Sequence, residues 1–402
     1  MKNLPKFDYI LGIIVLILLV FGLVMITSIG VPKSISLSAP GVLYPNCSDA
    51  GVDCYLLFKK HLVRLAFGLL AFLIAFRLPL RFWSKSSKLL YLATFVLLLV
   101  VVFYGASFGT IATNWLHIFN TSIQPSEFAK LTMAVYLSYW FSKQGVFVKS
   151  FKDGLLPFVL VSSFVMLPVL MQNDFGNTFV LGCIAVAIYI VAGARIRHLA
   201  IGLIFGIICM TIVVSTVDHV RERFDGYKKI NQNCTEDYCW QSQQANIAVG
   251  SGGFFGKGLT QGVQKSYWLP QASDDFIFAA SAEELGFVRI AFVVLLYFGI
   301  AYRGFLIAIH AEGNFEKYLA TGITVWIAGQ AFINIAVNLA LMPVTGLTLP
   351  FVSYGGSSLV SALIGVGILL NISKKSSYAT ANYRRGVRRA HNTKLGRYKR
   401  AF

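Results

Sequence analysis

Tyr9–Ile29 reads YILGIIVLILLVFGLVMITSI, an apolar run without one charged side chain. A helix needs about 20 predominantly apolar residues to cross the ~30 Å hydrocarbon core of a bilayer. The run is too long for the apolar core of a signal peptide, and no small-residue cleavage site follows it. It therefore predicts a first transmembrane helix.

Further apolar runs follow along the chain, in which 56% of the 402 residues are hydrophobic and only 13% are charged. They lie near 62–80, 88–106, 126–143, 154–171, 177–193, 198–217, 287–309, 317–341 and 355–372. The sequence thus predicts an all-α polytopic membrane protein of about ten transmembrane helices. Residues 1–372 form a single transmembrane domain in this interpretation, with a large external loop between helices 7 and 8.

Basic residues set the expected orientation, because 35 Lys and Arg outnumber 17 Asp and Glu. The tail 373–402 contains many Lys and Arg and no acid, and an even number of spans puts it on the side of the N-terminus. Since Lys and Arg mark the cytoplasmic side, both termini are expected in the cytoplasm. The tail suits a topogenic signal, contact with lipid or a cytoplasmic partner. No nucleic acid is expected to bind, because no base-contact pattern accompanies the charge.

Two large loops, near 31–60 and 217–275, are then external, and they contain most of the cysteines: Cys47, Cys54, Cys234 and Cys239. Paired cysteines on one face indicate an oxidising exterior. Four cysteines allow three disulfide connectivities, of which we favour the local pairs, Cys47 with Cys54 and Cys234 with Cys239. No external histidine clusters with them as a zinc site would require.

Two adjacent carboxylates, Asp274 and Asp275, precede the apolar run that begins near 287. Ionisable groups against hydrocarbon are costly and mark functional sites. The alternative is that one of them caps the following helix by accepting its free N–H groups.

A glycine-rich stretch, 250–262, lies in the same external loop, with Lys257 and Lys265 close by. Its backbone can approach a ligand closely, and its N–H groups can form an anion site. It is not a P-loop. It is either a flexible connector or, beside the carboxylates, part of a diphosphate or sugar site.

Other polar residues interrupt apolar sequence. Glu127 and Lys130 share a helix face, and they either pair structurally or line a polar cavity facing Asp275. Asp174 suits a turn. In the last external loop, Ser353 and Tyr354 offer hydroxyl groups to a polar ligand, while its small residues would equally suit close helix packing.

Several motifs together resemble one family, the SEDS proteins (shape, elongation, division, sporulation). They are QPSEFAK (124–130), GSGG (250–253), GKGL (256–259), DFIFA (275–279), AEELG (282–286) and GLTLP with SYGGSS (346–358). The resemblance covers essentially the whole chain in order. Asn338 and the 346–350 motif are more similar to the division branch than to the elongation branch.

The resemblance implies a peptidoglycan glycosyltransferase that polymerises lipid II, an undecaprenyl-diphosphate-linked precursor, on the outer face of the cytoplasmic membrane during cell division. It implies Asp275 as the catalytic residue. This chain departs from the family pattern by Ser273 and Asp274, which stand where the family usually has His and Thr. Implied partners are a class B penicillin-binding protein, which is a transpeptidase, and other division proteins.

The residues suit that chemistry. Asp275 can accept a proton from a sugar hydroxyl, or hold a divalent cation such as Mg²⁺ or Mn²⁺ that neutralises a diphosphate; no organic cofactor is expected. Asp274 is a supporting carboxylate. Glu283 lies two turns along the same helix face if the helix is continuous, and it either shapes the cavity or packs the helix. Lys130, Lys257 and Lys265 are weaker candidates for binding the diphosphate.

Three rival functions stay open. An elongation-type polymerase would perform the same chemistry. A flippase for the lipid-linked precursor should show inverted repeats with broken helices at mid-depth, and no convincing repeat is present. A non-catalytic division scaffold would not need Asp275 or the glycine-rich stretch.

Overall fold

The structure is a computed structural model that describes residues 7–40, 47–49, 51–105, 113–118, 121–228, 237–266 and 268–375. Its helices are α1 (Tyr9–Ile29), α2 (Val31–Ser38), α3 (Leu56–Arg77), α4 (Leu80–Tyr104), α5 (Pro125–Gln144), α6 (Leu156–Met171), α7 (Phe175–Val191), α8 (Ile196–Thr216), α9 (Asp218–Lys228), α10 (Asp237–Gly252), α11 (Ile277–Ile309) and α12 (Asn314–Asn338), followed by Gly356–Lys375. Strands β1 (Leu116–Ile118) and β2 (Thr121–Ile123) form a small antiparallel hairpin.

Every apolar run in the sequence coincides with a helix, so the prediction of an all-α polytopic membrane protein is confirmed. Within the described residues, six helices are long and apolar enough to cross a membrane by themselves. These are Tyr9–Ile29, Leu80–Tyr104, Phe151–Met171, Ile277–Ile309, Asn314–Asn338 and Gly356–Lys375. The large loop predicted after the seventh run contains two further helices, α9 and α10.

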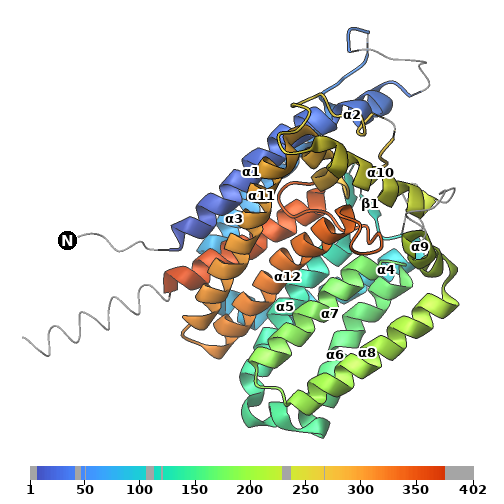
Figure 1. Ribbon diagram of the computed structural model, residues 1–402. Helices are drawn as coiled ribbons and strands as arrows, with labels where there is room; N and C mark the ends of the chain where they lie inside the picture. Colours follow the sequence, from blue (N-terminus) through green and yellow to red (C-terminus); the bar gives the residue numbers. More distant parts are fainter. Residues whose placement is uncertain are drawn as a thin grey trace, which may run out of the picture.

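The long helices run side by side, and α2, α9, α10 and β1 gather at one end of them (Figure 1). Helix α12 lies inside the bundle: 72% of its most apolar window is buried, against 28% for α4. The last helix, Gly356–Lys375, is buried to a similar degree, at 78%. Helix α4 therefore leaves most of its apolar surface to the lipid, while α12 and the last helix form the core.

The two ends of the described chain meet at the other end of the bundle. The Asp8 backbone N–H donates to the Ser373 hydroxyl at 3.0 Å. The Asp8 carboxylate also pairs with Arg303, which donates through Nη2 at 2.6 Å and Nε at 2.9 Å. The predicted basic tail, 373–402, lies outside the described residues from Ser376 onwards.

The external cysteines are partly described. Cys47 and Cys54 form a disulfide, as predicted. Cys239 is also disulfide-bonded and buried. Its predicted partner, Cys234, lies outside the described residues.

Helix α11 breaks at Gly286, whose φ of 76° and ψ of 175° are not helical. The break coincides with the predicted start of the span near 287. Segment 253–258 of the glycine-rich loop pairs with the broken backbone: the N–H of Lys257 donates to Glu283 O at 3.0 Å, and the N–H of Phe287 donates to Gly253 O at 2.9 Å. A break in a membrane helix is tolerated when neighbouring groups satisfy its backbone, which is what this loop does.

We predict that Gly286→Ala destabilises the protein by more than about 2 kcal/mol, because it combines backbone strain with overpacking. An alanine Cβ would lie 2.2 Å from Gly256 N, at a positive φ that side chains rarely adopt. The measurement is the thermal unfolding midpoint of the purified protein in detergent. The control is Gly329→Ala in α12, where a Cβ meets no atom within 4 Å. Equal midpoints for the two variants would contradict the prediction.

Candidate functional site

The acid pair, Asp274 and Asp275, lies in the turn that leads into α11, and its ion pair with Lys33 puts it at the end of the bundle that carries α2. Helix α11 begins at Ile277, and its N-cap residue, Phe276, makes no side-chain capping bond. The N–H of Ala279 is instead satisfied by the Asn338 side chain, at 2.9 Å. The capping alternative for the two carboxylates is therefore wrong.

Three amide side chains on one face of α12, Gln330, Asn334 and Asn338, form what we call the amide ladder. Asn334 and Asn338 both donate through Nδ2 to the backbone oxygen of Asp275, at 2.8 and 2.9 Å. Since Asn338 also accepts from the first turn of α11, one side chain fixes both the acid pair and the helix start. These residues are four apart, so sequence spacing alone could have identified the ladder.

The amide ladder also holds the last external loop, residues 339–355. Asn334 donates to Leu347 O at 2.6 Å, and Gln330 donates to Thr348 O at 3.0 Å. The loop in turn contacts the acid pair, because the Ser353 hydroxyl donates to Asp274 O at 2.5 Å and the Tyr354 N–H donates to Ser273 O at 3.0 Å. Ser353 and Tyr354 thus lie beside the carboxylates.

The carboxylates of the acid pair differ in their surroundings. Asp274 forms an ion pair with Lys33 of α2. The Asp275 carboxylate receives no hydrogen bond or ion pair from any residue that the structure describes. A Cβ added at Gly346 would lie 3.9 Å from Asp275 Oδ2. One acid is thus neutralised and the other is left available.

Burial, followed by the negative charge of Asp274, raises the pKa of Asp275 to about 7, against the opposing effect of Lys33 and Arg223. Burial likewise raises the pKa of Asp274, although Lys33 opposes that shift directly. A carboxyl with a pKa close to neutrality can both accept and release a proton at physiological pH.

Three basic residues from distant parts of the chain act on the acid pair: Lys33, Arg64 and Arg223. The Arg64 guanidinium lies over the Tyr354 ring, 4.5 Å from its centroid. Gly356 makes room for it, because a Cβ there would lie 2.8 Å from Arg64 Cδ. These residues were not predicted from the sequence, since nothing near them in the chain marks them as neighbours of the acid pair.

The lysines of the glycine-rich loop are engaged in ion pairs. Lys257 lies 2.6 Å from Glu283, and Lys265 lies 2.5 Å from Glu284. Glu283 also accepts from the N–H groups of Val263 and Gln264, at 3.1 and 3.0 Å. Because α11 begins after Asp275, Glu283 does not share a helix face with it; its carboxylate anchors the loop.

Glu127 and Lys130 form the ion pair that their spacing predicts, 2.7 Å long and buried. Lys130 Nζ also donates to Asn177 at 2.9 Å and to Gln330 at 2.6 Å. Its three donor positions are therefore satisfied inside the protein, where α5, α7 and α12 meet. This geometry agrees with the structural pairing that the sequence left open.

Asp174 is the N-cap of α7, as its position in a turn suggests, and it accepts from the Asn177 N–H at 3.1 Å. Its Oδ2 additionally accepts from Asn114 at 2.9 Å and from Gln124 at 3.1 Å. It is buried, and its charge raises the pKa of Asp275. Asp174 thus holds the turn in place by hydrogen bonds, and its charge acts on Asp275.

No cluster of three or more His, Cys, Asp or Glu side chains suited to a metal ion occurs among the described residues. A divalent cation beside Asp275 would therefore depend on the two carboxylates of the acid pair and on oxygens of the bound ligand. Two adjacent carboxylates are ligands of the kind that Mg²⁺ prefers.

Comparison with known proteins gives the family context. The model of the cell cycle protein family of FtsW, RodA and SpoVE matches residues 9–378. A probable peptidoglycan glycosyltransferase FtsW of Geobacter sulfurreducens is 33% identical over 93% of this chain and 97% of its own length. Stage V sporulation protein E of Bacillus subtilis is 36% identical over 92% of this chain and 98% of its own length.

Solved structures share the fold. A chain from a structure described as the coordination of polymerization and crosslinking by a peptidoglycan synthase complex aligns with a TM-score of 0.74 and 24% identity, over 93% of this chain and 99% of its own. The rod shape determining protein RodA of Thermus thermophilus aligns with a TM-score of 0.66, the same identity and the same coverage.

We predict that Lys130→Met lowers the thermal unfolding midpoint strongly, since removing one partner of a buried ion pair costs about 3–5 kcal/mol. The double variant Glu127→Leu/Lys130→Met should regain a large part of the loss, because it leaves no unpaired buried carboxylate. A single variant as stable as the unmodified protein would contradict the structural role of this pair.

Proposed function

This chain belongs to the cell cycle protein family of FtsW, RodA and SpoVE, the SEDS family, and on that basis we propose that it is a peptidoglycan glycosyltransferase that polymerises lipid II into glycan strands. The observation that carries the proposal at the level of residues is Asp275, a partly buried carboxyl without a hydrogen-bonding partner among the described side chains and with a pKa of about 7. A relative named as such an enzyme supports it over nearly the whole length.

Asp275 acts as the general base in this proposal. It accepts the proton of the acceptor sugar's 4-hydroxyl group as that oxygen forms a bond to the anomeric carbon of the donor. The bond between the anomeric carbon and the lipid diphosphate breaks, and the diphosphate leaves as an anion. A positioned base contributes about 10²–10⁴-fold to such a proton transfer.

The departing diphosphate needs positive charge, and we assign it to Arg64 and Arg223, supported by Lys33. These three cations act electrostatically on the acid pair from α3, α9 and α2. Ser353 bonds the backbone of Asp274 and Tyr354 bonds that of the preceding Ser273, so both are placed to bind the sugars. Such preorganised charge stabilises the transition state without reorganisation at the moment of reaction.

The remaining candidate site residues hold structural elements in place instead of contacting the substrate. Lys257 and Lys265 reach a diphosphate only if their ion pairs with Glu283 and Glu284 open, so we assign them first to holding the glycine-rich loop beside the site. Glu127 and Lys130 hold α5 against α12 and thereby the amide ladder. A bound Mg²⁺ or Mn²⁺ would neutralise diphosphate charge from the acid pair.

We place the enzyme in the cytoplasmic membrane, with both termini in the cytoplasm and Asp275 facing the exterior. The basic tail supports this orientation through the enrichment of Lys and Arg in cytoplasmic segments. The contact between Asp8 and Ser373 agrees with termini on one side. We further propose a class B penicillin-binding transpeptidase and other division proteins as partners, since one structural relative belongs to a complex of polymerization and crosslinking.

Relatives named FtsW favour a role in division over elongation. Fluorescent lipid II in proteoliposomes separates the other functions: a polymerase converts it to polymer, a flippase moves it between leaflets and a scaffold does neither.

We predict that Asp275→Asn abolishes polymerisation of lipid II by the protein reconstituted with its transpeptidase partner, with a loss of at least about 100-fold. Asp153→Asn is the matched control, because Asp153 is an exposed aspartate between α5 and α6. Polymer formation by Asp275→Asn at the control rate would disprove the base assignment and make Asp274 the residue to test next.

The rate should also depend on pH through Asp275. The base acts only when ionised, so kcat/KM is expected to fall as pH falls through about 7. Asp274→Asn removes a negative charge that raises the pKa of Asp275, so the fall of kcat/KM on the acidic side of the pH profile (the acidic limb) should move to lower pH. Lys33→Gln removes a positive charge that lowers it, and the limb should move to higher pH. Shifts in the opposite directions would contradict the electrostatic account.

A further inference from the structure

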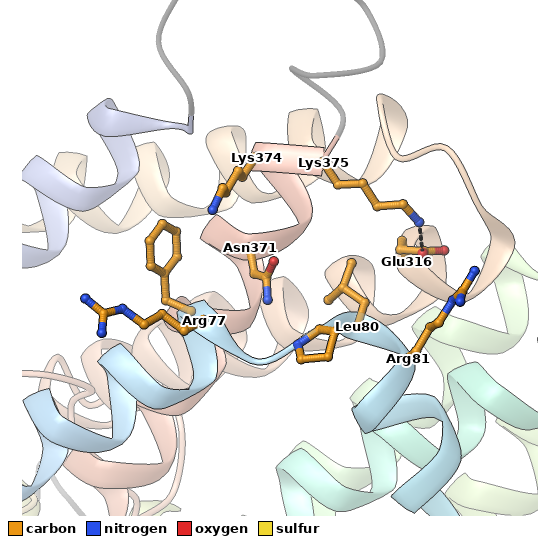
Figure 2. A pocket seen from close by; sticks show the side chains of 9 residues that line it. Arg77, Leu80, Arg81, Glu316, Asn371, Lys374 and Lys375 are labelled. Carbon is orange, nitrogen blue, oxygen red and sulfur yellow. Dashed lines mark hydrogen bonds and ion pairs between the residues drawn. The ribbon is translucent and has the colours of Figure 1, made fainter.

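A pocket lies where α12 begins, at the end of the bundle opposite to the acid pair that Asn338 bonds. Figure 2 shows the side chains that line this pocket. Its volume is about 420 Å³, and it opens between the turn that joins α3 to α4, the start of α12 and the end of the last helix. Glu316 in its wall and Asn338 beside Asp275 stand at opposite ends of α12, roughly 33 Å apart along the axis. The pocket therefore belongs to a different site from that of the proposed reaction.

The pocket is strongly basic. Arg77, Arg81, Lys374 and Lys375 line it together with one carboxylate, Glu316. Lys375 pairs with Glu316 at 2.6 Å, and Lys374 lies over the Phe76 ring, 5.5 Å from its centroid. The exposed Arg77 and Arg81 form no ion pair with any described residue. The wall thus presents a surplus of positive charge that nothing in the described protein neutralises.

A helix N-terminus adds to this charge. Helix α4 begins at Leu80 after Pro79, which offers no side-chain cap, and both residues line the pocket. The first N–H groups of a helix have no partner within it, and together with the helix dipole they favour a bound anion such as phosphate. The cations and the helix start therefore favour the same class of ligand.

One wall of the pocket is fixed by side-chain bonding. Asn371 of the last helix donates from Nδ2 to the backbone oxygens of Ala75 and Leu78, at the end of α3. These bonds hold the last helix against the turn that carries Arg77 and Pro79. The pocket is consequently formed before a ligand arrives.

Apolar surface continues from the pocket along the membrane helices. Leu73 and Ile74, in the last turns of α3, are 48% and 51% exposed, and Phe82 in the first turn of α4 is 43% exposed. Inorganic phosphate has no apolar part that could contact this surface, whereas the acyl chains of a phospholipid would cover it. Basic pockets between membrane helices on the cytoplasmic side bind anionic lipid head groups.

We propose that this pocket binds the phosphate head group of an anionic phospholipid. The phosphate lies between Arg77, Arg81 and Lys374 near the start of α4, and the acyl chains lie along α3 and α4. The site joins the α3–α4 turn to the last helix through the lipid.

The test compares Arg77→Gln/Arg81→Gln with Lys85→Gln/Lys88→Gln. The control removes the same charge from exposed residues of α4 that do not line the pocket. Binding of cardiolipin and of phosphatidylglycerol to the purified full-length protein is measured by native mass spectrometry during lipid titration. The pocket variant should bind about thirtyfold more weakly, about fivefold for each cation removed, while the control stays close to the unmodified protein.

Lys374→Gln gives a second, independent reading, since it removes no ion pair and should weaken binding about fivefold. Thermal unfolding midpoints show whether each variant is folded. Equal weakening in the pocket and control variants, or none in the pocket variants, would overturn the proposal. Inorganic phosphate binding that depends on Arg77 and Arg81 while neither lipid binds there would also overturn it, because the ligand would then be soluble.

Discussion

The hydrogen bonds from the amide ladder to non-helical backbone are the interaction on which the rest of the site depends. Backbone groups near hydrocarbon must be satisfied by the protein itself, because no water is there to bond them. Asn334 and Asn338 bond the Asp275 oxygen, and Gln330 and Asn334 bond the loop 339–355. Amides suit this task because one side chain both donates and accepts without carrying a charge. A rigid buried helix, α12, thereby holds an irregular segment in one conformation.

The broken backbone of α11 at Gly286 is satisfied by a second set of hydrogen bonds. The glycine-rich loop bonds the broken backbone of α11 on one side, and Glu283 and Glu284 neutralise its lysines. The lysines of the glycine-rich loop, which suggested a ligand site in the sequence, therefore stabilise the fold through ion pairs. The positive charge near the acid pair comes instead from Lys33, Arg64 and Arg223, in three other helices.

The sequence was sufficient for the helices and for the position of the acid pair, because hydropathy and motif order are local signals. The span starting near 287 was predicted from composition, and the structure explains that boundary by the break at Gly286. Capping by Asp274 or Asp275 was wrong, since Asn338 supplies the bond from a distance of about 60 residues. The cations Lys33 and Arg64 were missed because tertiary packing alone brings them to the site. The spacing of Gln330, Asn334 and Asn338 was a local signal that could have been used.

The extra carboxylate of this chain has a physical consequence for the proposed base. Burial is the largest cause of the raised pKa of Asp275, and the nearby cations oppose that rise by favouring the ionised carboxylate. Asp274 takes Lys33 as its partner and adds its own negative charge, which raises the pKa of Asp275. The charge of Asp274 thus adds to the effect of burial on the pKa of Asp275, while the cations stay available to stabilise a leaving diphosphate. In a chain with a neutral residue in place of Asp274, the same cations would act on Asp275 alone and lower its pKa. The ion pair between Asp274 and Lys33 therefore lets the same group of charged residues support both the proton transfer to Asp275 and the negative charge of the leaving diphosphate.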